Sequence, residues 1–244
     1  MNGRALLVGL KSVDPTHYAG QARIRGVEGC EADVDAMTRI LQPLGYDIQI
    51  LKTRSATVDG VLRDLRDAVR KTREADIFVF YFSGHGDQVR DRDGDEADGY
   101  DEALACFDGQ LVDDTLGDVW TQFIPGARIF MLSDSCHSGT VNRFGLAAPT
   151  RRPIQPLSDT AAGKMRAQLI HFGACRDAKD AVGRESGGEF TKALAGVWNN
   201  GAFTGDYPRF YERIVETILT AQEPQYQEYG PVGDAFRRSR PFSV

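Results

Sequence analysis

The hydrophobic positions of the chain fall into short continuous apolar runs, separated by segments in which apolar residues recur with helical spacing. Five of the runs are nearly continuous and are typical of strands buried on both faces. They cover residues 5–10, 46–51, 76–82, 127–133 and 167–173. Because such strands need cover on both sides, the pattern predicts a sheet at the centre of the protein.

The segments between these runs carry apolar residues every three or four positions, as amphipathic helices do. One period covers 32–44 and stops at Gly45, and a second runs from Val58 to Val69. Further helices are predicted over 113–124, 188–198 and 207–221. Strands that alternate with helices indicate an α/β fold, in which a mostly parallel central sheet is flanked by helices in a three-layer sandwich.

The chain length predicts one domain, because 244 residues can enclose one sizeable core. One stretch, 141–163, has three prolines and no hydrophobic period. It is longer than an ordinary connection in a compact domain, so we expect a mobile or functional loop there.

The cysteines and the apolar runs predict a soluble cytoplasmic protein with no membrane partner. The four cysteines are far apart and form no CxxC pair, which excludes a zinc knuckle and a small disulfide scaffold; they are Cys30, Cys106, Cys136 and Cys175. No apolar run reaches about 18 residues, and the first residues are too short an apolar stretch for a secretory signal.

The negative charge is local. Residues 91–102 hold seven acidic side chains and one arginine, which accounts for the whole net charge of −6. The rest of the chain is neutral and shows no broad basic face, so nucleic acid is not expected as a partner. The acidic run is either a solvated loop or part of a cation site.

Two of the predicted central strands end in polar turns, "FYFSGHGDQ" and "MLSDSCHSG". Active sites of open α/β sheets gather beyond the carboxyl ends of the strands. Because side chains alternate along a strand, Ser83 and His85 tend to share one face, as do Asp134 and Cys136. We therefore expect His85 and Cys136 to meet, although they are 51 positions apart.

A cysteine beside a histidine is suited to nucleophilic catalysis, because a free thiol is mostly protonated near neutral pH and needs a base. His85 can accept the thiol proton and protonate a leaving amine, and the N–H groups of Gly86 and Cys136 can hold an oxyanion. His137 is an alternative base. Its side chain points away from the thiol if the chain is extended, so we assign it to structure or to the pocket wall.

The motifs of both turns resemble those of the metacaspases and their bacterial relatives, the orthocaspases, which are caspase-like cysteine peptidases of clan CD. The similarity rests on "YFSGHG", "DSCHSG", "RGVEGCEADVDAM" and "DEADGYDEAL", with looser matches in "FGACRDAKDAVGRESGGEFTKAL" and "EPQYQEYGP". It implies one caspase-like peptidase domain over 1–244. A large-subunit-like part would cover about 1–140 and a small-subunit-like part about 164–244, with 141–163 as the linker.

The resemblance implies a Cys/His dyad in which Cys136 attacks the peptide carbonyl and His85 carries the proton. It also implies protein or peptide substrates cut after arginine or lysine, no cofactor for the chemistry, and a monomer in preference to a dimer.

The resemblance further places Cys30, Asp33, Ser83 and Asp134 around the primary specificity pocket. Cys30 and Asp33 are three residues apart, so they share a face of the predicted helix. Two carboxylates there would favour a basic side chain. The alternative for Asp33 is a solvated residue on the surface of its helix.

Calcium activation is a further implication of the resemblance, through Asp101, Asp113 and Asp114. Carboxylate oxygens are the ligands that Ca²⁺ prefers. Arg143 stands where the family has a fourth carboxylate. The alternative is that Asp113 and Asp114 cap a helix and favour its positive end.

The predicted linker contains two adjacent basic residues, Arg151 and Arg152, that are candidates for self-cleavage. Lys164 and Arg166, just beyond it, are alternatives. Self-cleavage would suit an enzyme that prefers basic residues, and a loop that is never cut is the other interpretation.

Three other functions share part of this pattern. A clostripain- or gingipain-like peptidase shares the dyad and the basic preference but fits "DEADGYDE" less well. A catalytically silent caspase-like module that binds a partner would normally lack the cysteine or the histidine, and both are present. A nucleotide-binding α/β domain would need a phosphate loop, and no GxGxxG or GxxxxGK[ST] occurs.

Overall fold

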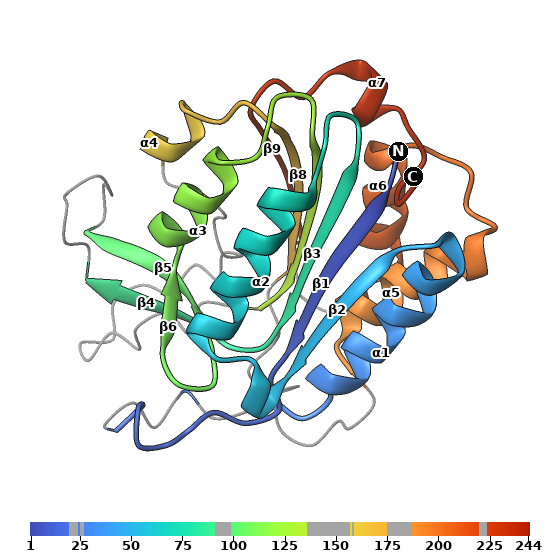
Figure 1. Cartoon of the computed structure of the whole chain (residues 1–244). Coiled ribbons are helices and arrows are strands. Elements are labelled where there is room, and N and C mark those ends of the chain that lie inside the picture. The colour runs from blue at the N-terminus through green and yellow to red at the C-terminus, as the bar shows by residue number, and fades with distance from the viewer. Residues whose placement is uncertain are drawn as a thin grey trace.

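The computed structural model describes residues 1–19, 24, 27–90, 99–135, 157, 159–174, 187–219 and 224–244. Its centre is a six-stranded sheet with the strand order β2-β1-β3-β7-β8-β9 (Figure 1). These strands are β1 (Gly3–Gly9), β2 (Asp47–Lys52), β3 (Ile77–Ser83), β7 (Arg128–Asp134), β8 (Gln168–Ala174) and β9 (Gln225–Tyr229). The first five are parallel and β9 is antiparallel to β8. The mostly parallel sheet predicted from the apolar runs is confirmed.

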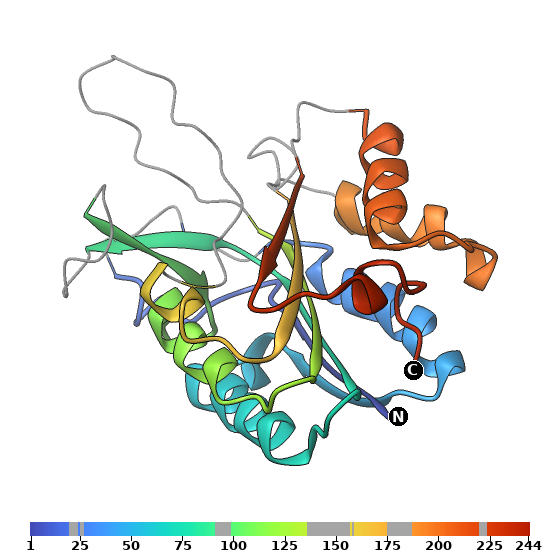
Figure 2. The same ribbon diagram turned by 90° about the horizontal axis from the view of Figure 1, so that it is seen from above.

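Helices cover both faces of the sheet, so the fold has three layers (Figure 2). One face carries α1 (Cys30–Leu41), α5 (Glu189–Trp198) and α6 (Tyr207–Thr217); the other carries α2 (Val58–Lys71) and α3 (Asp113–Thr121). All five helices were predicted. The first ends earlier than its period suggested, because Pro43 lies in a 3-10 turn, η1 (Gln42–Leu44), that follows it.

The central strand β3 shows why a continuous apolar run was needed. Every residue of β3 is buried, and alternate side chains enter two separate cores. Phe78 and Phe80 pack near Trp120 on the α2–α3 side. Val79 and Tyr81 belong to the core under α1 and α5. A strand with apolar side chains on one face only could not fill both.

Gly9 allows the first turn of α1 to lie directly against the end of β1. A Cβ at this position would stand 2.6 Å from the backbone oxygen of Cys30 and 2.6 Å from Cγ2 of Val34. Any side chain would therefore push α1 away from the carboxyl end of the sheet.

A second, small antiparallel sheet was not predicted. It has the order β4-β5-β6 and projects from the carboxyl edge of the main sheet (Figure 2). Its strands are β4 (Gly86–Arg90), β5 (Tyr100–Ala105) and β6 (Gln110–Val112). Their short, polar sequences hide the hydrophobic alternation that marks a strand.

The remaining elements are short. They are η2 (Thr53–Ser55), α4 (Asp159–Ala162), η3 (Asn199–Gly201) and α7 (Asp234–Arg237). The loop predicted over 141–163 is wrong near its end, because α4 forms one turn of helix there before β8 begins. Residues 141–156 and 158 lie outside the described residues. In the part of the chain that the structure describes, no helix is both long and apolar enough to cross a membrane.

The amino edge of the sheet is held by one buried carboxylate. Asp76 accepts hydrogen bonds from the N–H groups of Asn2 at 2.7 Å and Arg73 at 3.0 Å. It also pairs with the Arg4 guanidinium at 3.2 Å. Burial acts to raise the pKa of Asp76, but the two N–H groups and Arg4 outweigh it and leave the pKa below its ordinary value.

We expect Asp76→Asn to lower the free energy of unfolding by about 1–3 kcal/mol at pH 7, because charged acceptors make the stronger hydrogen bonds. Since folding lowers the pKa of Asp76, its contribution is present above the unfolded pKa and is lost as the pH falls through the folded one. Urea unfolding from pH 7 to pH 3 measures this. Asp47→Asn, at an exposed carboxylate, is the control, and equal losses in both variants would contradict the assignment.

Candidate active site

The two strands that end in the polar turns, β3 and β7, are neighbours in the sheet, as predicted. Strands β3 and β7 pair in parallel with Ser83 opposite Asp134, each the last residue of its strand. Both side chains are fully buried. Cys136 and His137 lie outside the described residues, so the contact between Cys136 and His85 stays a prediction.

His85 follows β3 between two glycines and is half-buried. Its carbonyl oxygen accepts a hydrogen bond from the N–H of Ala105 at 3.0 Å. The N–H of Gly84 donates to the carbonyl oxygen of Asp134 at 3.4 Å, and Gly86 begins β4 opposite Leu104. The backbone of His85 is therefore held between the two sheets, at the carboxyl edge of the central strands.

Asp33 lies on α1 and points into the protein, which rules out the solvated alternative, because the residue is only 2% exposed. Its Oδ2 accepts a hydrogen bond from the Ser83 hydroxyl at 2.8 Å. Its Oδ1 accepts one from the N–H of Gly188 at 2.7 Å. Cys30, at the first position of the same helix, is fully buried as well. The structure thus brings Asp33 to Ser83, whose neighbour across the strands is Asp134.

A residue of α5, Thr191, contacts the carboxylate of Asp134. Asp134 Oδ2 accepts a hydrogen bond from the Thr191 hydroxyl at 2.9 Å, and the Thr191 hydroxyl lies 2.6 Å from the hydroxyl of Tyr81. Sequence reasoning missed Thr191, Tyr81 and Gly188. The alternation along β3 places Tyr81 on the face of Ser83, but no local signal indicates which side of α5 meets the sheet.

The opposite face of the sheet carries a second buried polar group that the sequence did not reveal. Ser133 Oγ lies 2.9 Å from His171 Nε2, and His171 Nδ1 lies 3.1 Å from Gln227 Oε1. Burial lowers the pKa of His171 to about 4, although the hydrogen bond with Gln227 acts in the opposite direction. His171 is therefore neutral near pH 7. Both ring nitrogens of His171 contact side chains of the protein, so we assign this group to structure.

The metal candidates are only partly placed. Asp101 on β5 and Asp113 at the start of α3 are buried, and the N–H of Asp114 donates to Asp113 Oδ1 at 3.1 Å. Among the described residues, no group of three or more His, Cys, Asp or Glu side chains is arranged to hold a metal ion. Residues 91–98, with most of the acidic run, and Arg143 lie outside them.

The candidate self-cleavage residues divide into two pairs. Lys164 and Arg166 are exposed and precede β8, whose first residue pairs with Arg128 at the start of β7. They therefore lie at the amino edge of the sheet, one strand length of about 20 Å from the edge that carries Asp134. Arg151 and Arg152 lie outside the described residues.

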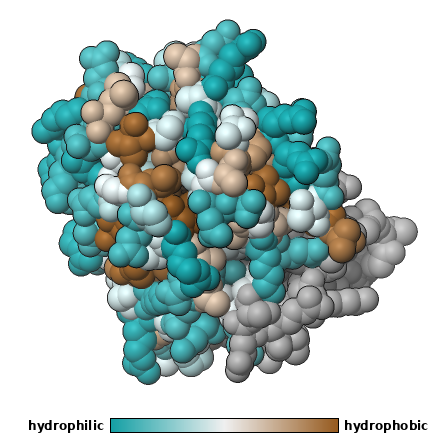
Figure 3. All heavy atoms as spheres, turned by 90° about the vertical axis from the view of Figure 1, so that its right-hand side faces the viewer, coloured by the Kyte–Doolittle hydropathy of each residue, from teal (hydrophilic) through white to brown (hydrophobic). Residues whose placement is uncertain are grey.

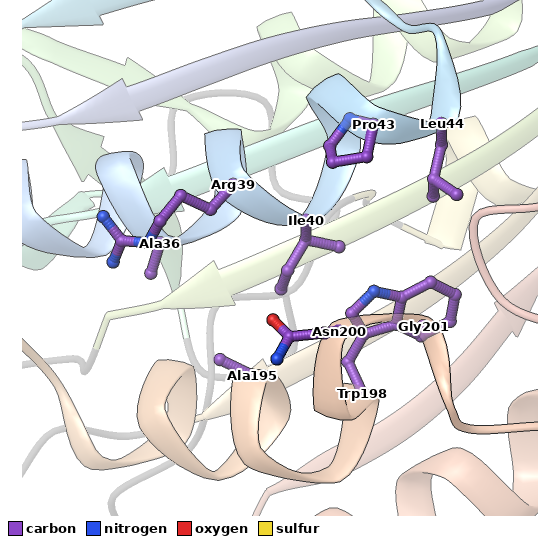
Figure 4. A pocket seen from close by; sticks show the side chains of 9 residues that line it. All are labelled: Ala36, Arg39, Ile40, Pro43, Leu44, Ala195, Trp198, Asn200 and Gly201. Carbon is purple, nitrogen blue, oxygen red and sulfur yellow. The ribbon is translucent and has the colours of Figure 1, made fainter.

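A pocket of about 180 Å³ elsewhere on the molecule lacks catalytic groups. It lies between the end of α1 with η1 and the end of α5, where Ile40, Leu44 and Trp198 supply apolar walls (Figure 4). The face that carries α1 and α5 also exposes patches of apolar side chains among hydrophilic ones (Figure 3). Arg39 and Asn200 are the polar side chains of the pocket lining, and neither is a nucleophile.

Comparison with known proteins is consistent with this arrangement. The family model described as "Metacaspase, peptidase C14 domain" matches residues 3–144, which include His85 and Cys136. Metacaspase-1 of Schizosaccharomyces pombe is 29% identical over 214 residues, which are 81% of this chain and 48% of that protein. Metacaspase-1 of Botryotinia fuckeliana is 38% identical over 153 residues, 56% of this chain and 34% of that protein. The chain thus spans about a third to a half of these curated relatives.

A solved structure matches over the whole chain. The crystal structure of protein GSU0716 from Geobacter sulfurreducens has a TM-score of 0.82 and 32% sequence identity, and the match covers 100% of this chain and 99% of that one. The α/β architecture is therefore one that another natural sequence also adopts.

We expect the stability of the protein to fall as the pH drops from about 6.5 to about 4, because His171 is neutral when folded and binds a proton when unfolded. The pKa difference corresponds to about 3 kcal/mol. Urea unfolding of wild type and His171→Gln at pH 7.5 and pH 5 measures this, and the variant should lose much of the dependence. His17→Gln, at an exposed histidine, is the control. An unchanged pH dependence in His171→Gln would contradict the assignment.

Proposed function

The chain belongs to the metacaspase family of cysteine peptidases, and from this premise we propose that it is an endopeptidase that cleaves peptide bonds after arginine or lysine. The observation that carries the proposal is the buried pair of carboxylates, Asp33 and Asp134, on either side of Ser83. Carboxylates form charge-assisted hydrogen bonds with guanidinium and ammonium groups. Two of them at the carboxyl edge of β3 and β7 would therefore favour an arginine or lysine side chain of a substrate.

The chemistry proposed for the chain uses Cys136 and His85. His85 takes the thiol proton, and the thiolate attacks the carbonyl carbon of the scissile bond. The negative charge then rests on the carbonyl oxygen, which the N–H groups of Gly86 and Cys136 stabilise. His85 returns the proton to the leaving amine as the C–N bond breaks. A water molecule hydrolyses the resulting thioester, which releases the new carboxyl terminus and restores the thiol.

The geometry around His85 supports this role. The residue is half-buried, so a substrate can reach it, and its backbone is bonded to β5. The flanking glycines have no side chains that would obstruct an extended peptide. Because β3 and β7 end side by side, a nucleophile two residues beyond Asp134 comes from the strand adjacent to the one that carries the histidine.

We expect purified protein to cleave fluorogenic peptides that end in arginine or lysine, and not matched peptides that end in aspartate. Cys136→Ala and His85→Ala should abolish turnover and leave the melting temperature nearly unchanged, because both residues act on the substrate. Cleavage after aspartate, or activity retained in Cys136→Ala, would overturn the proposal.

A neutral isostere tests the charge of the pocket. Citrulline has the shape of arginine without its charge, so wild type should prefer arginine. Asp134→Asn should lower kcat/KM for the arginine peptide at least about tenfold, the scale of one charged hydrogen bond. The same change should affect the citrulline peptide much less. Asp118→Asn, at an exposed acid on α3, is the matched control.

Calcium activation belongs to the same proposal. It is supported by the burial of Asp101 and Asp113. The described acids alone do not form a ligand set, so ligands would also have to come from 91–98, and no catalytic step is assigned to the ion. For self-cleavage, the proposal favours Arg151 and Arg152 over Lys164 and Arg166, which face the wrong edge of the sheet for a cut by the same chain.

If calcium activates the enzyme, the double variant Asp113→Asn/Asp114→Asn should lose the response and keep the activity measured in chelator. The assay is cleavage of the arginine peptide across a calcium titration. Calcium activation that persists in the double variant would place the ion elsewhere.

A further inference from the structure

The Asp134 carboxylate of the proposed specificity pocket accepts a hydrogen bond from the hydroxyl of Thr191, a residue on α5. We propose that Thr191 is a positioning residue that orients the Asp134 carboxylate toward the basic side chain of the substrate, with Tyr81 orienting Thr191 in turn. This inference rests on the proposed preference for arginine and lysine.

The hydroxyl groups form a chain with only one consistent direction. Thr191 has one hydroxyl proton, and a carboxylate can only accept, so Thr191 donates to Asp134 Oδ2 at 2.9 Å. Tyr81 must then donate to Thr191 Oγ1 across the 2.6 Å contact. A hydroxyl that accepts one hydrogen bond becomes a stronger donor of the next. The order is therefore Tyr81 to Thr191 to Asp134.

Burial makes this chain effective as an orienting device. Tyr81 and Asp134 are 0% exposed and Thr191 is 1% exposed, so water does not compete for the hydroxyl groups. Removing the Thr191 hydroxyl would leave Asp134 Oδ2 without its donor from α5. The carboxylate would then lose a contact that fixes one of its oxygens, and it would be held less firmly for an incoming cation.

The same end of α5 also holds the other carboxylate. The N–H of Gly188, the residue before α5, donates to Asp33 Oδ1 at 2.7 Å. Gly187 has a φ of +90°, and a Cβ there would collide with Asp33 Oδ1. Asp33 and Asp134 come from α1 and β7, and the start of α5 holds both. The part of the chain before residue 140 thus supplies the charges, and the part after 187 orients them.

The experiment compares matched peptides that end in arginine or citrulline across four variants. Thr191→Val removes the hydroxyl and keeps the shape, Thr191→Ser keeps the hydroxyl, and Tyr81→Phe removes only the first donor. Thr72→Val is the control, because Thr72 is also buried and its hydroxyl donates to the Ala68 carbonyl on α2, away from the pocket.

Thr191→Val should raise KM for the arginine peptide about tenfold with kcat within about twofold, the scale expected when one hydrogen bond to a charged group is lost. Its preference for arginine over citrulline should fall in parallel. Thr191→Ser should keep both KM and the arginine preference close to those of the wild type. Tyr81→Phe should raise KM and lower the preference, by less than Thr191→Val does. Thr72→Val should change neither.

The outcomes separate this inference from the proposed function. A wild type that cleaves arginine and citrulline peptides alike, or neither, overturns both. A wild type that prefers arginine, with Thr191→Val folded and unchanged in KM and preference, overturns the positioning role alone. Equal losses in Thr191→Val and Thr72→Val would do the same. Should Thr191→Val fail to fold, Tyr81→Phe decides, and an unchanged preference in that variant rejects the inference.

Discussion

The pairing of β3 with β7 is the constraint on which the site depends. Both strands are buried on both faces, and their register places Ser83 opposite Asp134 where the strands end. In a parallel sheet, the residues that follow such strands leave at the same edge. The chain therefore leaves β3 and β7 from adjacent strand ends, after Ser83 and Asp134. A shift of one residue in this register would turn every side chain of one strand to the other core.

The cost of burying charge explains the polar contacts around that pairing. Asp33 and Asp134 are enclosed, and each oxygen with a described partner receives a hydrogen bond from a hydroxyl or a backbone N–H. Such bonds offset part of the desolvation cost without neutralising the charge. The two carboxyl groups are thereby provided with donors inside the protein. On the other face of the sheet, the buried side chains of Ser133 and His171 are neutral and contact each other.

The two faces of the sheet consequently have different roles. The face of α1 and α5 carries the acidic side chains and the helix start that orients them. The face of α2 and α3 carries the aromatic packing around Trp120 and the buried His171. The polar positions of the candidate site lie at the last residues of β3 and β7 and on the helices that cover them.

The sequence alone predicted five strands of the main sheet, the five main helices and the polar residues at the strand ends, because hydrophobic period and strand alternation are local properties of the chain. Strand β9 was not among the predicted strands, because its sequence QYQEY is not an apolar run. The family resemblance also indicated Asp33, Ser83 and Asp134 as candidate pocket residues, and the structure places these three near one another. Only the tertiary structure decided which side chains meet. Thr191 contacts Asp134 across 57 positions, and Gly188 contacts Asp33 across 155. No local pattern encodes such contacts, because they depend on how α5 packs against the sheet. The sheet β4-β5-β6 was not predicted, because its strands are short and polar and find their partners only in the folded chain.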